Sequence, residues 1–184
     1  MSEYDTYDLE DIRKLVDGEL PWTTVQQMMK NGKDTDRFDK WITILQSRVE
    51  WDEQILLPLT PALYIVQKPD DRVVKCRCGH EFGDYRVNWK LKALIYVRDD
   101  EEKLSEVYRG LEQPDPEWMQ LREYYCPGCG SQLEVEALPR GCPPDFEFLP
   151  DLDTFYGKWL GRPLPDEGNY ENRDLTVETI NGWS

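Results

Sequence analysis

The sequence contains very little histidine, and this scarcity limits the chemistry that the chain can perform. His80 is the only histidine among 184 residues. A conventional triad of nucleophile, histidine base and carboxylate therefore has no free base if His80 lies at or beside a metal. A glycine-rich phosphate loop and a dinucleotide-binding fingerprint are also missing. Neighbouring carboxylates such as Asp99 and Asp100 occur in charge runs, which are typical of solvated surfaces and helix starts. We therefore expect no catalytic residue in this chain.

Positive charge is also scarce. The 22 lysines and arginines are outnumbered by 37 aspartates and glutamates, which gives a net charge of −15. Nucleic-acid binding depends on cationic side chains that displace counterions from phosphates, so this balance argues against a nucleic-acid partner. The same repulsion disfavours an anionic membrane surface. No apolar run approaches the roughly 20 residues of a membrane-spanning helix, so we expect no membrane association.

The N-terminal residues, Met1 to Asp5, are polar and acidic. They resemble neither a secretion signal nor a transit peptide. Thiols of cytoplasmic proteins are kept reduced. We therefore expect a cytoplasmic protein whose cysteines are free to bind metal.

Four of the five cysteines form two tight pairs. One pair lies in residues 76–80, with the sequence C-R-C-G-H, and the other in residues 126–130, with the sequence C-P-G-C-G. A structural zinc ion takes four thiolate or imidazole ligands in a tetrahedron. Each turn supplies two ligands at once, and the glycine after its second cysteine permits a tight backbone. The pairs therefore predict a closed structural metal site, with zinc as the expected ion.

The spacing leaves the ligand set open. The simpler set is Cys76, Cys78, Cys126 and Cys129, whereas in the other set His80 replaces one member of the first pair. His80 could also lie outside the ligands and donate a hydrogen bond to a sulfur. Two disulfides are an alternative to a metal, but cysteines separated by one residue form a strained bridge. Iron is a further alternative, because two such pairs could build a rubredoxin-like electron-transfer site.

The fifth cysteine and the aromatic residues are less specific features. Cys142 stands among prolines without a histidine to activate it, so we expect a free thiol. Seven tryptophans and ten tyrosines are more than one small core usually needs. Tryptophan and tyrosine are favoured at protein interfaces, so this content favours a subunit. An aromatic-rich core would explain it equally well.

Residues 1–52 are predicted to form an N-terminal helical segment. A first helix is indicated by apolar residues at helical spacing: Leu9, Ile12, Leu15 and Val16. Asp8 or Thr6 can cap its start, and Gly18 can end it. Pro21 opens a second helix that closes near Gly32. A third helix has a broad apolar stripe: Phe38, Trp41, Ile42, Leu45 and Val49.

Residues 53–138 are predicted to form a zinc-stapled β core with an inserted helix. We expect strands over 62–66 and 73–74, joined by a polar turn, with the second strand leading into Cys76. Alternating apolar and polar residues over 89–97 predict a further half-buried strand. The inserted helix is indicated by apolar spacing before Pro114: Leu104, Val107, Tyr108 and Leu111.

Two more strands are expected on either side of the second cysteine pair, over 121–125 and 133–137. Residues 139–184 then begin with a proline-rich stretch. A short amphipathic helix follows, with apolar residues on one face: Leu152, Phe155, Tyr156, Trp159 and Leu160. Beyond Pro165 the tail is polar and acidic, and we expect it to drape over a partner or to be disordered.

Together these patterns predict one compact domain of the α+β class. It would contain a zinc-ribbon-like antiparallel sheet, N-terminal helices, and a C-terminal helix with an extended tail. The three segments, 1–52, 53–138 and 139–184, would share this domain.

Several ordered motifs between about Leu9 and Pro165 have a common resemblance. They are the helical stretch 37–46, Trp51-Asp52 with 55–58, the cysteine motifs 76–82 and 126–130, residues 88–91, residues 122–124, and Phe155-Tyr156 with 159–161. In their order and over nearly the whole chain, they resemble the small gamma subunit of acetone carboxylase and related ATP-dependent ketone carboxylases. The acidic tail after Pro165 is the part that resembles the family least.

The resemblance implies a small subunit in a hetero-oligomer with two larger subunits, alpha and beta, as an α2β2γ2 assembly. Such complexes carboxylate acetone with bicarbonate and ATP, without biotin, and produce acetoacetate. The family pattern assigns ATP, the ketone and a catalytic divalent metal such as Mn2+ to the larger subunits. It assigns zinc to the small subunit. Acetophenone-type carboxylases follow the same pattern, so the ketone stays open.

Two other functions are compatible with the cysteine pairs alone. One is a stand-alone zinc-ribbon module that binds another protein. The other is a rubredoxin-like iron redox protein that supplies electrons to an enzyme. Neither explains the ordered motifs outside the cysteine pairs.

Overall fold

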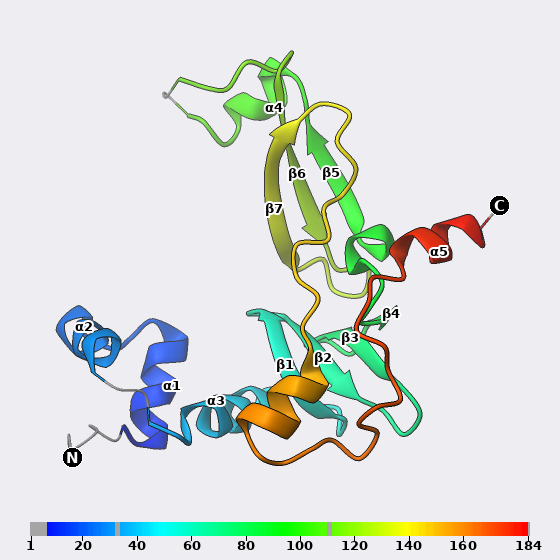
Figure 1. Ribbon diagram of the computed structural model, residues 1–184. Helices are drawn as coiled ribbons and strands as arrows, with labels where there is room; N and C mark the ends of the chain where they lie inside the picture. Colours follow the sequence, from blue (N-terminus) through cyan, green and yellow to red (C-terminus); the bar gives the residue numbers. More distant parts are fainter. Residues whose placement is uncertain (1–6, 32–33, 110–111, 184) are drawn as a thin grey trace.

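The three N-terminal helices lie at one end of the molecule, and they come from the part of the sequence with helical periodicity. The computed structural model describes residues 7–31, 34–109 and 112–183, and Figure 1 shows this helical end as α1 (Leu9–Asp17), α2 (Trp22–Lys30) and α3 (Arg37–Gln46). Asp8 caps α1 by accepting a hydrogen bond from the backbone N–H of Asp11, and Gly18 ends the helix with a φ of 72°. The first helix is therefore confirmed. Helix α3 ends before Val49, so the predicted stripe was one turn too long.

Thr6, Gly32 and Leu111, which were used in the helix predictions, lie outside the described residues, as do Met1 to Asp5.

A four-stranded antiparallel sheet, which we call the first sheet, packs beside the helices (Figure 1). Its strands occur in sequence order: β1 (Gln54–Thr60), β2 (Leu63–Gln67), β3 (Arg72–Cys76) and β4 (Glu81–Asp84). The predicted pair of strands is confirmed as β2 and β3, with Ile65 opposite Val74. Every residue of β3 and the first four of β2 are buried. The first sheet is therefore covered on both faces.

A second, three-stranded antiparallel sheet lies at the other end of the molecule (Figure 1). This second sheet has the order β5-β6-β7, with β5 (Leu94–Arg98), β6 (Met119–Tyr125) and β7 (Gln132–Pro139). Strands β6 and β7 confirm the two strands expected around the second cysteine pair. The α+β class with antiparallel sheets is confirmed, but the β core forms two sheets where the sequence suggested one.

The strand predicted over 89–97 is wrong in its first half. Residues Trp89–Lys92 form a 3-10 turn, η1, and only β5 is extended. The side chain of Asn88 causes this turn, because its Oδ1 accepts a hydrogen bond from the backbone N–H of Lys90 at 3.0 Å. The predicted burial also fails in β5, where Leu94, Ile95 and Tyr96 are all exposed.

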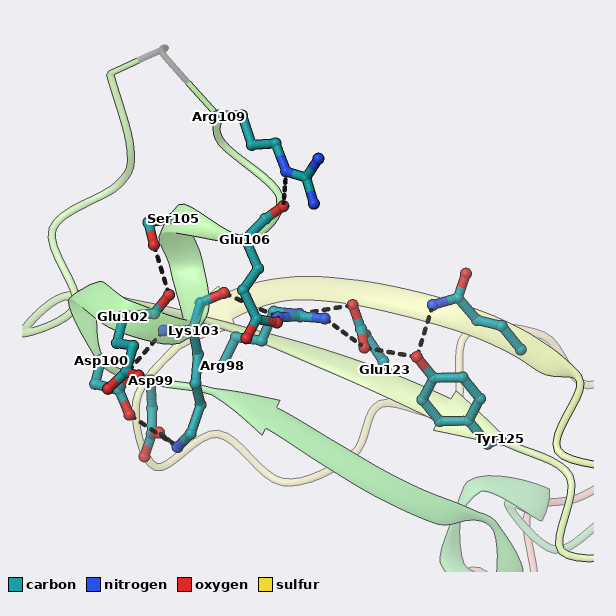
Figure 2. Close-up of polar contacts among 11 residues, drawn as sticks. Arg98, Asp99, Asp100, Glu102, Lys103, Ser105, Glu106, Arg109, Glu123 and Tyr125 are labelled. Atoms are coloured by element: carbon teal, nitrogen blue, oxygen red, sulfur yellow. Dashed lines mark hydrogen bonds and ion pairs between the residues drawn. The ribbon is translucent and has the colours of Figure 1, made fainter.

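A short helix, α4 (Glu101–Ser105), covers one end of the second sheet and is held there by charges (Figure 2). Arg98 donates to Glu123 at 2.8 Å and to the carbonyl of Lys103 at 2.9 Å. Glu123 also accepts from the hydroxyl of Tyr125 at 2.7 Å. The network ties the helix to two neighbouring strands. It confirms an inserted helix, although a shorter one than the spacing suggested.

The C-terminal residues return to the first sheet. Helix η2 (Thr154–Trp159), a π-helix, lies beside α3, and α5 (Thr176–Asn181) follows near the end of the chain (Figure 1). Between them, Asp166 receives a 2.6 Å ion pair from the fully buried Arg72, whose guanidinium lies 4.6 Å from the ring centre of Tyr170. The disorder expected as one alternative for the tail is therefore wrong over these residues, whereas its contact with a partner stays a prediction. The tail packs on its own chain because Arg72 needs buried acidic partners.

The largest hydrophobic cluster connects the first sheet, the cysteine turns and η2. Two smaller clusters lie between α3 and the first sheet and among α1, α2 and α3. No helix in the described part of the chain has both the length and the apolar character needed to cross a membrane.

Candidate metal centre

The two cysteine pairs meet where the two sheets join. The first pair lies at the turn between β3 and β4, and the second at the turn between β6 and β7. Each turn is closed by a backbone hydrogen bond, from Cys76 N–H to the carbonyl of His80 at 2.8 Å and from Cys126 N–H to the carbonyl of Ser131 at 2.9 Å. Each sheet therefore supplies one pair of thiols to the same site.

The distances among the four sulfurs fit a metal better than disulfides. The Sγ atoms of Cys76, Cys78, Cys126 and Cys129 all lie within 4.8 Å of one another. Cys76 Sγ is 3.9 Å from Cys129 Sγ, and Cys78 Sγ is 3.7 Å from Cys126 Sγ. A tetrahedron with metal–sulfur bonds of about 2.3 Å has edges of about 3.8 Å. A disulfide needs about 2.05 Å. The four thiols could therefore hold one tetrahedral ion.

The glycine after each second cysteine has the backbone conformation that the sequence suggested. Gly79 has a φ of 96° and Gly130 a φ of 70°, in the left-handed region that other residues rarely adopt. Both turns can therefore reverse direction within a few residues and present two sulfurs on the same side.

The four thiols differ in exposure. Cys76 and Cys126 are fully buried, whereas Cys78 and Cys129 are exposed. Burial raises the pKa of the Cys76 and Cys126 thiols because the thiolate is poorly solvated there. Hydrogen bonding to Ser131, whose Oγ lies 3.2 Å from Cys129 Sγ, lowers the pKa of the Cys129 thiol to about 6. One edge of the site thus faces the interior and the other faces the surface.

His80 does not join the group of thiols. The group that the described residues assemble contains four sulfurs and no imidazole nitrogen. The ring of His80 instead packs edge-on against Phe82, with ring centres 5.0 Å apart. Its Cβ also lies close to Gly128 of the second turn, where an added Cβ would come within 2.9 Å. His80 therefore helps to pack the two turns together.

Two residues that support the site were missed in the sequence. Ser131 contacts the exposed sulfur of Cys129, as described above. Trp51 donates from its indole N–H to the carbonyl of Arg77 at 3.2 Å, and the Lys75 ammonium lies 4.8 Å from its ring centre. The position of Ser131, two residues after the last cysteine, could have indicated it. No local pattern connects Trp51 with a turn 26 residues later.

A second acidic group contains Glu134, Glu136 and Glu147, whose carboxylates lie within 4.8 Å of one another. Lys90 already provides a cation there, with its Nζ 2.7 Å from Glu134 and in contact with Glu136. The phenol of Tyr124 donates to Glu136 at 2.6 Å. The buried Lys90 ammonium thus already holds these carboxylates together, so we interpret the group as structural.

The fifth cysteine, Cys142, is separate from the four-thiol group and half-buried. Its carbonyl accepts a hydrogen bond from Arg122. Its thiol is free, as the sequence suggested.

Comparisons with known proteins give one consistent result. A family model described as the acetone carboxylase gamma subunit matches residues 49–160. The acetone carboxylase gamma subunit of Xanthobacter autotrophicus is 43% identical over 165 residues, which cover 89% of this chain and 98% of that protein. The acetophenone carboxylase beta subunit of Aromatoleum aromaticum is 34% identical over 79 residues, which cover 42% of this chain and 61% of that protein.

Proposed function

The chain belongs to the acetone carboxylase gamma subunit family, and on this basis we propose that it is the small, zinc-containing structural subunit of an ATP-dependent, biotin-independent ketone carboxylase. The observation that carries the zinc assignment is the four-thiol group, with sulfur–sulfur distances of 3.7 and 3.9 Å in two of its pairs. Cys76, Cys78, Cys126 and Cys129 would be the ligands. Zinc is favoured over iron because a closed thiolate site with a purely structural role is its commonest protein use.

The zinc ion would connect the two sheets. A metal with four protein ligands has no open position for substrate, so it would contribute folding free energy without taking part in carboxylation. His80 would stay outside the ligands and hold the two turns in contact through its packing on Phe82 and Gly128. With the metal bound, segments 1–52, 53–138 and 139–184 would form one cooperative domain.

The chemistry would take place on the partner subunits. We assign ATP, the ketone and a catalytic divalent metal such as Mn2+ to two larger subunits, alpha and beta, in a cytoplasmic α2β2γ2 assembly. The reaction would join acetone and bicarbonate at the expense of ATP to give acetoacetate. The likeness to an acetophenone carboxylase subunit supports the ketone carboxylase class and leaves an aromatic ketone as the alternative substrate.

Native mass spectrometry with elemental analysis of the co-expressed complex tests this proposal. We expect one zinc per copy of this chain and co-purification with both larger subunits. Iron with visible sulfur-to-iron absorption would favour the rubredoxin-like redox protein. A zinc-containing monomer that does not bind either larger subunit would favour the stand-alone module.

A further inference from the structure

An apolar groove of about 1050 Å3 lies between the N-terminal helices and the C-terminal helix η2. We call it the helix groove. It lies on the side of the molecule where η2 runs beside α3 (Figure 1). Its apolar wall comes from α3, β1, η2 and the residue that follows η2: Phe38, Trp41, Leu59, Phe155, Trp159 and Leu160.

The aromatic residues of the helix groove form a connected wall that remains accessible. Phe155 packs edge-on against Phe38 with ring centres 5.0 Å apart, and against Trp159 with ring centres 5.9 Å apart. Trp159 nevertheless keeps 75% of its surface exposed, and Trp41 keeps 37%. A large aromatic surface that is exposed to solvent in the isolated chain is typical of a protein-binding site.

The charges around the helix groove oppose the charge of the whole chain. Arg37, Arg48 and Arg77 line it together with a single carboxylate, Asp34. Asp34 is buried and already accepts from Arg37 at 2.6 Å. The groove is therefore locally cationic in a chain of net charge −15.

Arg77 is the cation best placed for a partner. Its side chain is exposed, and within the described ranges it forms no ion pair. Arg48, by contrast, is paired with Asp17 at 2.8 Å. A carboxylate that approached the groove could thus bind Arg77 without breaking an existing pair, and such charge complementarity mainly favours specific association.

We propose that the helix groove binds an apolar segment with acidic side chains from one of the two larger carboxylase subunits. Apolar residues of that segment would cover Trp159 and Trp41, and a carboxylate would pair with Arg77. A second copy of this chain fits less well, because two chains that each carry a net charge of −15 repel one another. This inference rests on the proposed function and names the surface through which the subunit docks.

Matched variants can test the groove in the assembly itself. We expect Trp159→Ala and Arg77→Glu to weaken binding of the chain to the co-expressed larger subunits by at least about tenfold each. The control for the first is Trp118→Ala, since Trp118 is 74% exposed but lies outside the groove. The control for the second is Lys30→Glu, an exposed cation on α2. Both controls should bind like the wild-type chain.

A photo-crosslinker placed at Trp159 identifies the occupant. We expect it to capture an apolar, acidic segment of a larger subunit; capture of a second copy of this chain, or equal binding by all four variants, would overturn the inference. Zinc content and unfolding temperature of each variant show whether lost binding reflects lost folding. If the wild-type chain itself does not bind the larger subunits, the proposed function is wrong and this inference is wrong with it. If the wild-type chain assembles and the groove variants bind equally well, only the proposed role of the helix groove is overturned.

Discussion

The two sheets have the same antiparallel form but are stabilised in different ways. In the first sheet, β3 is buried throughout and β2 nearly so, and both lie within the main hydrophobic clusters. In the second sheet, Leu94, Ile95 and Tyr96 of β5 are exposed. From this sheet only Tyr124 and Leu133 belong to the main cluster, and Cys126 joins it from the turn between β6 and β7.

Ion pairs take the place of a core in the second sheet. Arg98 pairs with Glu123, and Lys90 pairs with Glu134 and Glu136. Charged pairs with little solvent around them are net weak stabilisers, because desolvation offsets much of their attraction. The second sheet should therefore depend on the metal that joins it to the first, whereas the first sheet has a core of its own. This difference can be tested by four perturbations.

Loss of the metal should have the largest effect. Cys126→Ser removes one buried ligand, and a structural zinc site contributes on the order of 10 kcal/mol to folding. We expect hydrogen exchange to accelerate throughout β5, β6 and β7 while β2 and β3 stay protected. Cys142→Ser is the matched control, since Cys142 lies outside the four-thiol group, and it should change neither zinc content nor exchange. Equal exchange in both sheets after metal loss would mean that the first sheet also depends on the metal.

Removal of Arg98 should have the next largest effect. Arg98→Met leaves the buried carboxylate of Glu123 without its cation, and breaking a pair of this kind costs about 3–5 kcal/mol. The double variant Arg98→Met with Glu123→Leu removes both charges and should recover most of that loss. Urea unfolding of the zinc-bound chain measures both values. A double variant as unstable as the single one would show that the network does more than neutralise its own charges.

A pair of isoleucine truncations compares the cores directly. Ile65 in β2 is 1% exposed and Ile95 in β5 is 43% exposed. Ile65→Ala should destabilise the chain by about 2–5 kcal/mol, since it leaves a cavity. Ile95→Ala should cost about 1 kcal/mol or less. The same unfolding measurement checks both, and similar losses would mean that β5 contributes a core after all.

Sequence patterns predicted the parts of the fold that rest on local rules. Helix α1 follows from apolar spacing between Asp8 and Gly18, and β2 and β3 follow from two apolar runs around a polar turn. The turn at Asn88 was missed, because Trp89, Leu91 and Ala93 alternate in sequence like a strand. One side-chain hydrogen bond from Asn88 outweighs that alternation.

The candidate site was predicted more completely than its surroundings. Paired cysteines followed by glycine define a turn with two ligands, so the four thiols could be named from the sequence, with His80 left as an alternative to one of them. The sequence did not show that the thiols meet between two separate sheets. The apolar residues of β5 suggested a half-buried strand in one common core, whereas they are exposed in the structure. The contact between Asp166 of the tail and Arg72 could not be predicted either, because the two residues are 94 positions apart in the sequence.

Acidification should have the smallest effect and should act on the second sheet through Glu123. The hydrogen bond from Arg98 lowers the pKa of Glu123 below its usual value. A carboxylate with a depressed pKa in the folded state stabilises the fold above its unfolded pKa, and that contribution is lost as pH falls through the folded pKa. Glu123→Gln should therefore be less stable than wild type at pH 7 by about 1–3 kcal/mol.

The stability gap between wild type and Glu123→Gln should close as pH falls below about 4.3, the usual pKa of a free glutamate. Acid also protonates thiols and weakens metal binding, but this affects both proteins and cancels in their difference. Unfolding curves of the two chains from pH 7 to pH 3 measure the gap at each step. A gap that stays constant across this range would mean that the charge of Glu123 adds nothing to the second sheet, and that its hydrogen bonds to Arg98 and Tyr125 act through geometry alone.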